Sequence, residues 1–394
     1  MVNQRVVIKF GGADLSTGEK IKRAAELVVK SPYKEKAVVV SAMGNATDSL
    51  LATMGKLGEI KDEDYAQILS MGERTSTRVI CAALKALGAR AEAFDPADEN
   101  WPIITDSNYR DAKPNVEETR RLVQKFVVPL LPEAIPVICG FLGKDKEGHV
   151  TTLGRGGSDT TALLLAHCLE ADEVILVKET SGVLSADPKF VPTAKPLERL
   201  DVHEMFDLAQ GGARIIKPES LKHKLPNQKL RIVNFASENL AAGGTEITGS
   251  FNINSTEMTS ERKLLALNVV CEVNAENLQQ VLSALSQKPI YGISSGRQSL
   301  TVFTTDGNIR EVLHRLHEVA GFKAISHREN VALLQVSHPI FVDSPGGVAR
   351  ISNALSLNGI NIIEVTTSKA TINVFIEDSN LRRAMEAITN VFEA

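Results

Sequence analysis

The sequence predicts an α/β protein in which a mainly parallel sheet lies between layers of helices, followed by two smaller ferredoxin-like α+β units. Up to about residue 248, apolar runs typical of buried strands alternate with helical patterns, which indicates a parallel sheet covered on both faces. Residues 241–260 are rich in Gly, Ser, Thr and Asn and predict a linker. Beyond them, the predicted elements follow a β-α-β-β-α-β order, which is the ferredoxin-like plan.

The first region carries five predicted strands and five predicted helices. The strands are short, nearly continuous apolar runs, at 6–10, 37–41, 136–141, 173–177 and 231–234. The helices show apolar residues at helical spacing, at 21–29, 65–87, 116–131, 160–169 and 202–209. Ligands of such sheets bind outside the carboxyl ends of the strands. The residues that follow the first two strands are therefore candidates for a binding site.

The second region contains two successive sets of predicted elements. The first set has strands at 264–273, 299–304 and 331–336, with helices at 275–286 and 309–320. The second set has strands at 339–342, 360–365 and 371–376, with helices at 347–357 and 381–392. These patterns divide the chain into a first domain at 1–248, a linker at 249–262, and two units at 263–330 and 331–394.

Composition and charge exclude several classes of function. The 394 residues carry a formal net charge of −4, and no face is obviously basic, which argues against a nucleic-acid-binding protein. The apolar runs are too short for a transmembrane helix, and a strand begins too early to leave room for a signal peptide. The four cysteines form no CxxC pair and the eight histidines form no HExxH, so no metal site is predicted. We expect a cytoplasmic protein with reduced thiols that binds neither nucleic acid nor membrane.

A glycine-rich loop with one arginine lies directly before the predicted helix at 160–169. It contains Gly154, Arg155 and Gly157, followed by Ser158 and Asp159. Glycines let a backbone approach a ligand closely, and the amides at a helix start attract anions. The planar charge of Arg155 suits a carboxylate or a phosphate. The alternative is a tight turn with a surface arginine, in which Ser158 and Asp159 serve only as helix caps.

A second candidate segment follows the first predicted strand. Lys9 lies near the carboxyl end of that strand and is followed closely by Gly11 and Gly12. A lysine that faces glycine amides suits a polyphosphate; the alternative is an edge strand with a lysine that extends to solvent. The sequence has no GxxxxGK[ST] loop and none of the glycine-rich, HRD or DFG motifs of protein kinases.

Together, these segments resemble the aspartate kinase branch of the amino acid kinase family. Lys9-Phe10-Gly11-Gly12 is similar to the family's KFGG motif, and 153–159 is similar to its LGRGGSD motif. Weaker similarities follow the same order along the chain, at 39–44 with Thr47, at Gly72-Glu73-Arg74, at 182–188 and at 212–218. In the second region, 344–349 and 358–363 resemble an ACT domain. Because this architecture often nests one ACT unit inside the other, the boundary near residue 330 is left open.

The resemblance implies an ATP-dependent kinase that converts L-aspartate to 4-phospho-L-aspartate, the first step of lysine, threonine and methionine biosynthesis, with Mg²⁺ bridging the nucleotide phosphates. Lys9 and Asp159 are the implied catalytic pair. A carboxylate acceptor is already ionised at pH 7, so the reaction needs no general base. Arg155 is expected to bind the substrate α-carboxylate and Glu73 its ammonium group. The further substrate contacts implied are Ser41, Thr47 and Ser158.

The implied nucleotide site departs from the family pattern. Its residues are Lys9, Gly11, Gly12, Gly157, Lys178, Glu179, Leu184, Lys189 and Arg214. Leu184 stands where the family usually has tyrosine, Glu179 where it has aspartate, and Lys178 adds a charge beside it. These changes leave two alternatives open, namely a related acceptor such as homoserine and a catalytically weak amino-acid sensor. Glu73 also has an alternative, as an exposed helix residue.

The ACT resemblance implies regulation and assembly. It implies a homodimer or a higher homo-oligomer formed through the ACT units, and feedback by an amino acid such as lysine or threonine. The effector residues expected are Asn358, Ile360, Asn361 and Ile362, whose backbone amides and carbonyls would bind the two charged ends of an amino acid. The alternative for this loop is a simple helix-to-strand turn.

Overall fold

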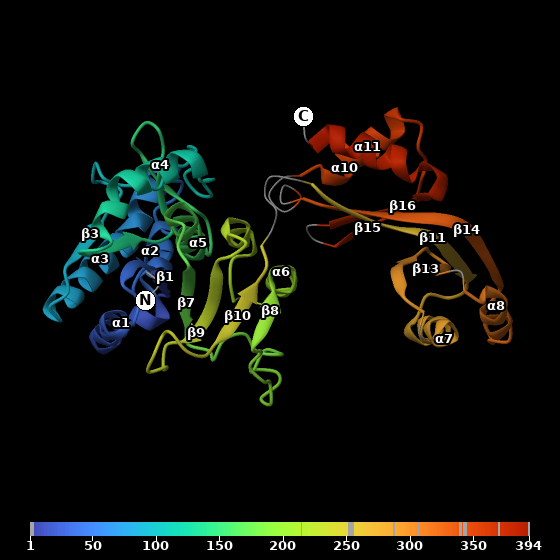
Figure 1. Ribbon diagram of the computed structural model, residues 1–394, viewed down its shortest axis with the longest axis horizontal. Coiled ribbons are helices and arrows are strands. Elements are labelled where there is room, and N and C mark those ends of the chain that lie inside the picture. The colour runs from blue at the N-terminus through green and yellow to red at the C-terminus, as the bar shows by residue number, and fades with distance from the viewer. Residues whose placement is uncertain are drawn as a thin grey trace. The chain divides into compact units, whose positions relative to one another are not determined.

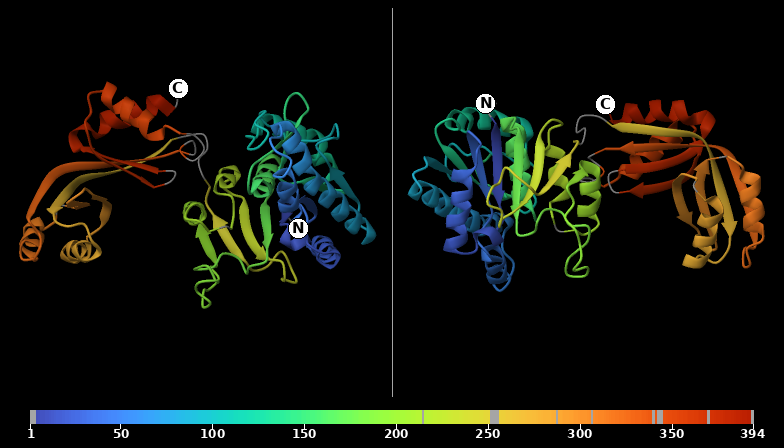
Figure 2. Two further views of the ribbon diagram at one scale, coloured as in Figure 1. Left: turned by 180° about the vertical axis from the view of Figure 1, so that it is seen from behind. Right: turned by 60° about the horizontal axis from the view of Figure 1, so that its bottom comes forward.

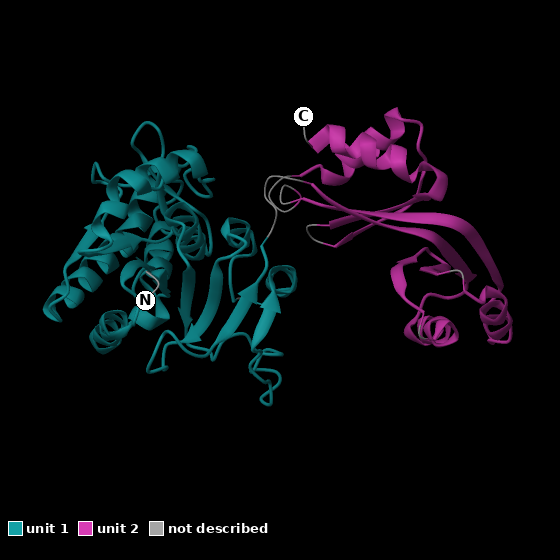
Figure 3. Ribbon diagram, viewed as in Figure 1, with its two compact units in different colours: residues 1–251 teal, residues 252–394 magenta. Residues whose placement is uncertain are grey.

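The computed structural model describes residues 4–213, 215–250, 256–286, 288–305, 307–338, 341, 345–368 and 371–392. The chain forms two compact units, Met1–Phe251 and Asn252–Ala394 (Figure 3). In the described part of the chain, none of the helices combines the length and the apolar character that a membrane span requires.

The first unit is built on an eight-stranded sheet with the order β3-β4-β2-β1-β7-β9-β10-β8 (Figure 1). Its strands are β1 (Arg5–Phe10), β2 (Glu35–Val40), β3 (Ala91–Phe94), β4 (Ile135–Cys139), β7 (Glu173–Lys178), β8 (Arg199–Asp201), β9 (Lys229–Asn234) and β10 (Thr245–Thr248). Neighbours from β3 to β9 are parallel, and β10 is antiparallel to β9. All five predicted strands are confirmed, whereas the short β3, β8 and β10 and the hairpin β5 (Leu142–Lys144) and β6 (Val150–Thr152) were not predicted.

Helices cover both faces of this sheet. They are α1 (Gly18–Lys30), α2 (Ala46–Met54), α3 (Asp62–Ala86), α4 (Val116–Phe126), α5 (Gly157–Leu169) and α6 (Val202–Gln210), with 3₁₀ turns η1 (Ala13–Leu15), η2 (Val128–Leu130) and η3 (Pro218–His223). Alternate residues of β1, Val6 and Ile8, share an apolar cluster with α1 and α3. Lys9 points to the opposite face, where it meets α5. The predicted mainly parallel α/β sandwich is confirmed.

Several helix boundaries differ from expectation by three residues or more, and for α4 the physical reason is clear. The helix predicted over 116–131 ends at Phe126, and a 3₁₀ turn that contains Pro129 follows. Proline has no amide hydrogen to continue an α-helix, which explains the early end. Helix α5 begins at Gly157, three residues before the predicted start, and every one of its residues is buried.

The second unit contains one six-stranded sheet with the order β12-β13-β11-β14-β16-β15. Its elements are β11 (Glu257–Val270), α7 (Ala275–Leu285), β12 (Ile290–Ser295), β13 (Ser299–Thr305), α8 (Ile309–His317), β14 (Ala324–Ser337), α10 (Gly347–Leu357), β15 (Ile362–Ser368), β16 (Thr371–Glu377) and α11 (Leu381–Phe392). Of the strand predicted over 339–342, only Phe341 lies within the described residues, and it is helical.

The two long strands β11 and β14 show that the ferredoxin-like units are interleaved. The second half of β11 pairs with β13 and belongs to the first ferredoxin-like unit, whereas residues 257–261 pair with 333–337 of β14 and complete the second ferredoxin-like unit. The predicted linker at 249–262 is therefore too long, because residues 257–262 are strand. Lys263 and Asn330, with φ of 54° and 58°, mark equivalent irregularities near the middle of the two long strands.

In the second compact unit, two pairs of helices pack against the sheet. Helices α10 and α11 pack against β14 and β16, and α7 and α8 pack against β11 and β13, on opposite sides (Figure 2). On the faces without helices, the rings of Phe303 and Phe375 stack with centroids 3.7 Å apart. Ser294 also donates a hydrogen bond to Glu364 at 2.9 Å, which joins the edge strands β12 and β15.

Candidate active site

The carboxyl end of β1 places a buried lysine against the first turn of α5. Lys9 Nζ lies 2.8 Å from Asp159 Oδ1, and both side chains are about 6% exposed. Lys178, the last residue of β7, reaches the same carboxylate, with Nζ 3.3 Å from Oδ2. Because β7 is the direct parallel neighbour of β1, the sheet brings together three charged residues that are up to 169 positions apart.

The pKa of Asp159 reflects this pairing. Burial by itself would raise the pKa of the carboxyl group, but the positive charges of Lys178 and Lys9 outweigh burial and hold it at about 2. Burial lowers the pKa of Lys178, and Asp159 partly opposes that effect. Asp159 is therefore a permanent anion that fixes two ammonium groups in place.

The glycines after Lys9 lie close to other backbone segments. The amide of Gly11 donates to Asp14 Oδ2 at 2.9 Å. Gly12 has an ordinary φ of −60°, but a Cβ there would lie 2.7 Å from the carbonyl oxygen of Ala42. Gly12 is thus required for a close approach of two chains. Asp14, which was not predicted as a site residue, is buried, and its Oδ1 has no hydrogen-bond partner among the described residues.

The start of α5 shows why its loop is rich in glycine. Gly156 is the N-cap in a left-handed conformation with φ of 77°, and no side chain caps the helix. The alternative in which Ser158 and Asp159 are only caps is therefore wrong. A Cβ on Gly157 would lie 2.8 Å from Leu153, so this residue serves close packing. Ser158 is buried against Gly140, at the end of β4.

Arg155 is exposed and makes no hydrogen bond or ion pair with any residue that the structure describes. The loop around it is nevertheless held in shape. Lys217 Nζ donates to the carbonyl of Leu153 at 2.9 Å and lies 3.7 Å from Asp111 Oδ1. Lys217 also packs against Gly156, where a Cβ would lie 2.9 Å from its side chain. The guanidinium of Arg155 thus projects, unpaired, from a well-supported loop.

Glu73 on α3 is buried at 3% exposure, so its alternative as an exposed helix residue is wrong. The amide of Ala42 donates to its Oε1 at 3.0 Å, and its Oε2 has no partner among the described residues. Burial raises the pKa of Glu73 to about 7, although Ala42 and the charge of Lys9 oppose the rise. Glu73 therefore retains one buried carboxylate oxygen without a partner among the described residues.

Ser41 and Thr47 lie on the same side as Glu73. Ser41 directly follows β2, and its amide donates to the carbonyl of Phe10 at 3.2 Å. Thr47 is in the first turn of α2, where its Oγ1 lies 4.0 Å from the position of a Cβ on Gly72. The structure therefore gathers Ser41, Thr47 and Glu73 beside the end of β1.

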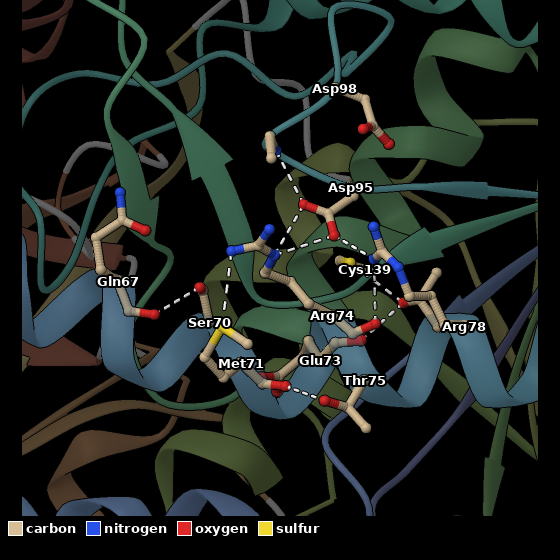
Figure 4. Close-up of polar contacts among 12 residues, drawn as sticks. Gln67, Ser70, Met71, Glu73, Arg74, Thr75, Arg78, Asp95, Asp98 and Cys139 are labelled. Atoms are coloured by element: carbon tan, nitrogen blue, oxygen red, sulfur yellow. Dashed lines mark hydrogen bonds and ion pairs between the residues drawn. The ribbon is translucent and has the colours of Figure 1, made fainter.

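A cluster that was not predicted fixes helix α3 next to Glu73. Arg74 and Arg78 both reach Asp95, which directly follows β3 (Figure 4). Arg74 Nε lies 2.9 Å from Asp95 Oδ1, and Asp95 is fully buried. Burial would raise the pKa of Asp95, but the amide of Ala97 and the two arginines together lower it. Nothing in the sequence signalled this cluster, because β3 was not predicted and the arginines lie 17 and 21 positions from Asp95.

The remaining residues implied for the nucleotide are more dispersed. Glu179 is 59% exposed and pairs with Lys20 at 2.9 Å. Leu184 is half-buried in a bridge with Pro196, and Lys189 is exposed in the following loop. Arg214 lies outside the described residues. Among these positions, Lys178 is the one that contacts Asp159.

The predicted effector loop ends helix α10. The amides of Asn358, Gly359 and Ile360 donate to carbonyls of that helix, and Ile360 is buried in the core. Asn361 is exposed and Ile362 begins β15. Of the amides expected to bind an effector, those at 358 and 360 are thus already used.

A group of metal-type side chains, Asp145, Glu147 and His149, lies in the turn between β5 and β6. Asp145 accepts hydrogen bonds from the amides of Glu147 and His149 at 3.0 and 2.8 Å. These contacts account for the buried carboxylate as part of the turn.

Comparison with known proteins identifies the family. The model of the amino acid kinase family matches residues 4–234, more than half of the chain, and that of an ACT domain matches residues 326–390. The aspartokinase of Corynebacterium glutamicum is 30% identical over 418 aligned positions, which cover 98% of this chain and 96% of that protein. Aspartokinase 2 of Bacillus subtilis is 27% identical, with 98% and 97% covered.

Solved structures share the fold. The aspartate kinase from Synechocystis matches with a TM-score of 0.73 at 23% identity, over 99% of this chain and 70% of that chain. Aspartokinase III of E. coli, in complex with aspartate and ADP, matches with a TM-score of 0.59 at 20% identity, over 98% and 99%. The chain therefore belongs to the amino acid kinase family, on its aspartokinase branch, with a C-terminal ACT region.

Proposed function

We propose that this chain is an aspartate kinase, which transfers the γ-phosphoryl group of ATP to the side-chain carboxylate of L-aspartate and forms 4-phospho-L-aspartate, the first step of lysine, threonine and methionine biosynthesis. The observation that carries the proposal is that groups suited to phosphate and a group suited to an amino acid lie together at the carboxyl ends of the central strands. Lys9 and Lys178 are held by Asp159, as phosphate binding requires, and Glu73 keeps a free oxygen beside them. Curated relatives of similar length support the assignment.

The acceptor side fits an amino acid with two carboxylates. The unpaired Arg155 would bind the α-carboxylate, bidentately where geometry allows. The free Oε2 of Glu73 would accept a hydrogen bond from the α-ammonium group, and that positive charge would compensate the buried carboxylate. Ser41, Thr47 and Ser158 would add polar contacts. The second carboxylate of the substrate would then point towards Lys9.

The phosphate side supplies charge and position. Lys9 would neutralise the transferring phosphoryl group, with Asp159 holding its ammonium in place and the amides of Gly11, Gly12 and Gly157 nearby. The acceptor is ionised at pH 7, so no side chain has to remove a proton. Lys178 is proposed to contact the phosphates of the nucleotide, and Glu179, Leu184, Lys189 and Arg214 to contact its other parts.

We also propose that Mg²⁺ accompanies ATP. When bound, it would neutralise negative charge on the nucleotide phosphates, and because it would enter the site with the nucleotide it would need few protein ligands. The turn of Asp145, Glu147 and His149 is not assigned to it, because Asp145 already accepts backbone hydrogen bonds.

Regulation by an amino acid is proposed from the ACT region. Aspartokinase III of E. coli has been solved in complex with lysine and aspartate in a T-state. For this chain we propose an amino-acid effector at Asn358, Ile360, Asn361 and Ile362, a homodimer or higher homo-oligomer formed through the ACT units, and a cytoplasmic location. With two of the loop amides used by α10, the exposed Asn361 is the expected centre of that site.

A coupled assay of ADP release tests the function. ADP release with aspartate, and none with homoserine or N-acetylglutamate, is the expected result. Turnover with homoserine alone would contradict the substrate assignment. A folded protein that releases ADP with none of the three acceptors would instead be an amino-acid-sensing relative without kinase activity.

A further inference from the structure

Besides Glu73, four charged side chains lie at the end of β1, of which Lys9, Asp14 and Asp159 are buried and Lys178 is 23% exposed. Lys9 and Lys178 both contact Asp159. The fourth charge is Asp14, in the turn η1, at 1% exposure. Neither Asp14 nor the pairing of the two lysines was expected from the sequence.

Asp14 lies next to Lys9 without forming an ion pair with it. A Cβ placed on Gly11 would lie 3.3 Å from Asp14 Oδ2 and 3.9 Å from Lys9 Nζ, so both groups border the same small space. Burial raises the pKa of Asp14, whereas the amide of Gly11 and the charges of Lys9 and Lys178 oppose that rise. Burial lowers the pKa of Lys178, and the charge of Asp14 is one of the effects that oppose that fall. Oδ1 of Asp14 has no partner among the described residues.

The carboxylate of Asp159 is already paired with Lys9, so its pairing does not explain the presence of Lys178. Lys9 already contacts that carboxylate at 2.8 Å, whereas Lys178 contacts it at the longer distances of 3.3 and 3.4 Å. Holding a second, partly buried ammonium beside the first is unfavourable unless a counter-charge lies nearby. Asp14 supplies that counter-charge, and the longer contacts leave hydrogen-bond donors of Lys178 available to a ligand.

We propose that Lys178 is a second lysine for the terminal phosphates of the nucleotide, and that Asp14 is the positioning residue whose negative charge offsets it. This inference rests on the proposed function, because it assumes that a nucleoside triphosphate binds beside Lys9. It adds to that function a charge pair that sets how tightly the polyphosphate is held.

The two members of the pair have opposite expected effects on nucleotide affinity. Lys178→Met removes a charge-assisted hydrogen bond and should weaken MgATP binding about tenfold or more. Asp14→Asn removes a negative charge near the phosphates and should strengthen MgATP binding about threefold to tenfold. The double variant should return towards the wild-type affinity. AMP, which lacks the terminal phosphates, should bind all variants within about twofold.

Isothermal titration calorimetry of the full chain with MgATP and with AMP, without aspartate, measures these dissociation constants. Equal MgATP affinity in wild type and Lys178→Met would overturn the role of Lys178. Unchanged or weaker MgATP binding in Asp14→Asn would overturn the role of Asp14. Lys178→Arg should restore most of the affinity. If the methionine variant does not fold, Lys178→Gln carries the same prediction, since it keeps a donor for Asp159 without the charge.

Lys224→Met is the matched control. Lys224 is as buried as Lys9, at 3% exposure, but its ammonium donates to the carbonyls of Leu225 and Gly249. Its loss should lower the melting temperature and leave the MgATP dissociation constant within about twofold. ADP release with aspartate is measured in parallel. A wild type that binds MgATP through Lys178 but does not phosphorylate aspartate would refute the proposed function and leave this inference standing.

Discussion

The phosphate side and the acceptor side of this site differ in how far their charges are satisfied within the protein. On the phosphate side, Asp159 binds Lys9 and Lys178, and Asp14 accepts from Gly11. On the acceptor side, Arg155 has no partner in the described part of the chain and Glu73 keeps one oxygen free. On the first side every charged group already has a protein partner, with one oxygen of Asp14 left over, whereas the groups of the second side are completed by a ligand.

This difference separates catalysis from recognition. Groups already held by partners cost little reorganisation when charge develops in the transition state, which is how preorganised sites accelerate reactions. Groups without partners gain most from a ligand that pairs them. For Glu73 the gain is removal of an unpaired buried polar group, and for the exposed Arg155 it is a charge-assisted, bidentate contact. Changes on the phosphate side should therefore lower kcat, and changes on the acceptor side should raise KM for aspartate.

The largest expected effect is on the phosphate side. Lys9→Ala should lower kcat at least about 10²-fold to 10³-fold, since it removes a preorganised positive charge at the transferring group. The fold should persist, because Lys178 still pairs with Asp159. The loss in free energy of unfolding should stay below the roughly 3–5 kcal/mol of an orphaned buried charge. ADP release and thermal unfolding measure both; near-normal activity would show that Lys9 does not serve the phosphoryl group.

Glu73 makes the acceptor side sensitive to pH. Its pKa is raised from 4.5 to about 7, so between these values the unfolded chain releases a proton that the folded chain keeps. The contribution to stability is fully present below about pH 4.5 and is lost as pH rises through about 7. It amounts to about 3 kcal/mol at 1.36 kcal/mol per pKa unit.

Denaturant unfolding of wild type and Glu73→Gln at pH 5 and pH 8 tests this directly. The advantage of wild type over the variant should shrink by about that amount at pH 8. Saturating aspartate should reverse part of the loss, because its ammonium group stabilises the ionised carboxylate. A difference that is independent of pH would mean that Glu73 ionises normally in the folded protein.

Substitution of Arg155 tests substrate binding alone, because loss of this exposed side chain should not change the stability of the fold. Arg155→Ala should raise KM for aspartate about 10-fold to 100-fold, the usual cost of a lost charged hydrogen-bond pair. The MgATP dissociation constant and the melting temperature should stay unchanged, since the side chain is exposed and unpaired. Arg155→Lys should be intermediate, because an ammonium cannot form the bidentate contact. A fall in kcat at unchanged KM would place Arg155 on the phosphate side instead.

The sequence predicted some residues on each side of the site and missed others. The strand ends that carry Lys9 and Ser41 followed from apolar runs, and the glycine loop gave Arg155 and Asp159. Asp14, Asp95 and Lys217 were missed because their roles depend on contacts across the fold that no local pattern encodes. Arg74 is 21 positions from Asp95, and Lys217 is 64 positions from Leu153.

The regulatory region shows the same limit at the level of elements. Its helices at 347–357 and 381–392 were predicted with their observed ends. The strand that begins at Glu257 was taken for linker, because its first half is exposed and polar and gains its place only by pairing with β14. Local periodicity reports burial on one element, whereas an interleaved strand is defined by its distant partner.

The smallest expected effect lies at Gly12, where the two sides touch. A Cβ there would lie 2.7 Å from the carbonyl of Ala42, the residue whose amide holds Glu73, and 3.0 Å from that of Gly44. Both neighbours are backbone atoms that cannot rotate away, so Gly12→Ala should destabilise the protein by about 1–3 kcal/mol. It should also raise KM for aspartate a few-fold, because displacement of Ala42 moves the partner of Glu73.

Gly11→Ala is the matched control for that change. A Cβ on Gly11 would meet Asp14 Oδ2 at 3.3 Å and Lys9 Nζ at 3.9 Å, both at the ends of side chains that can adjust. It should therefore cost less stability than Gly12→Ala and leave KM for aspartate near the wild-type value, with any loss appearing in kcat. Equal effects of the two alanines on KM would show that the phosphate and acceptor sides move as one body, and the distinction between a complete side and an open side would then fail.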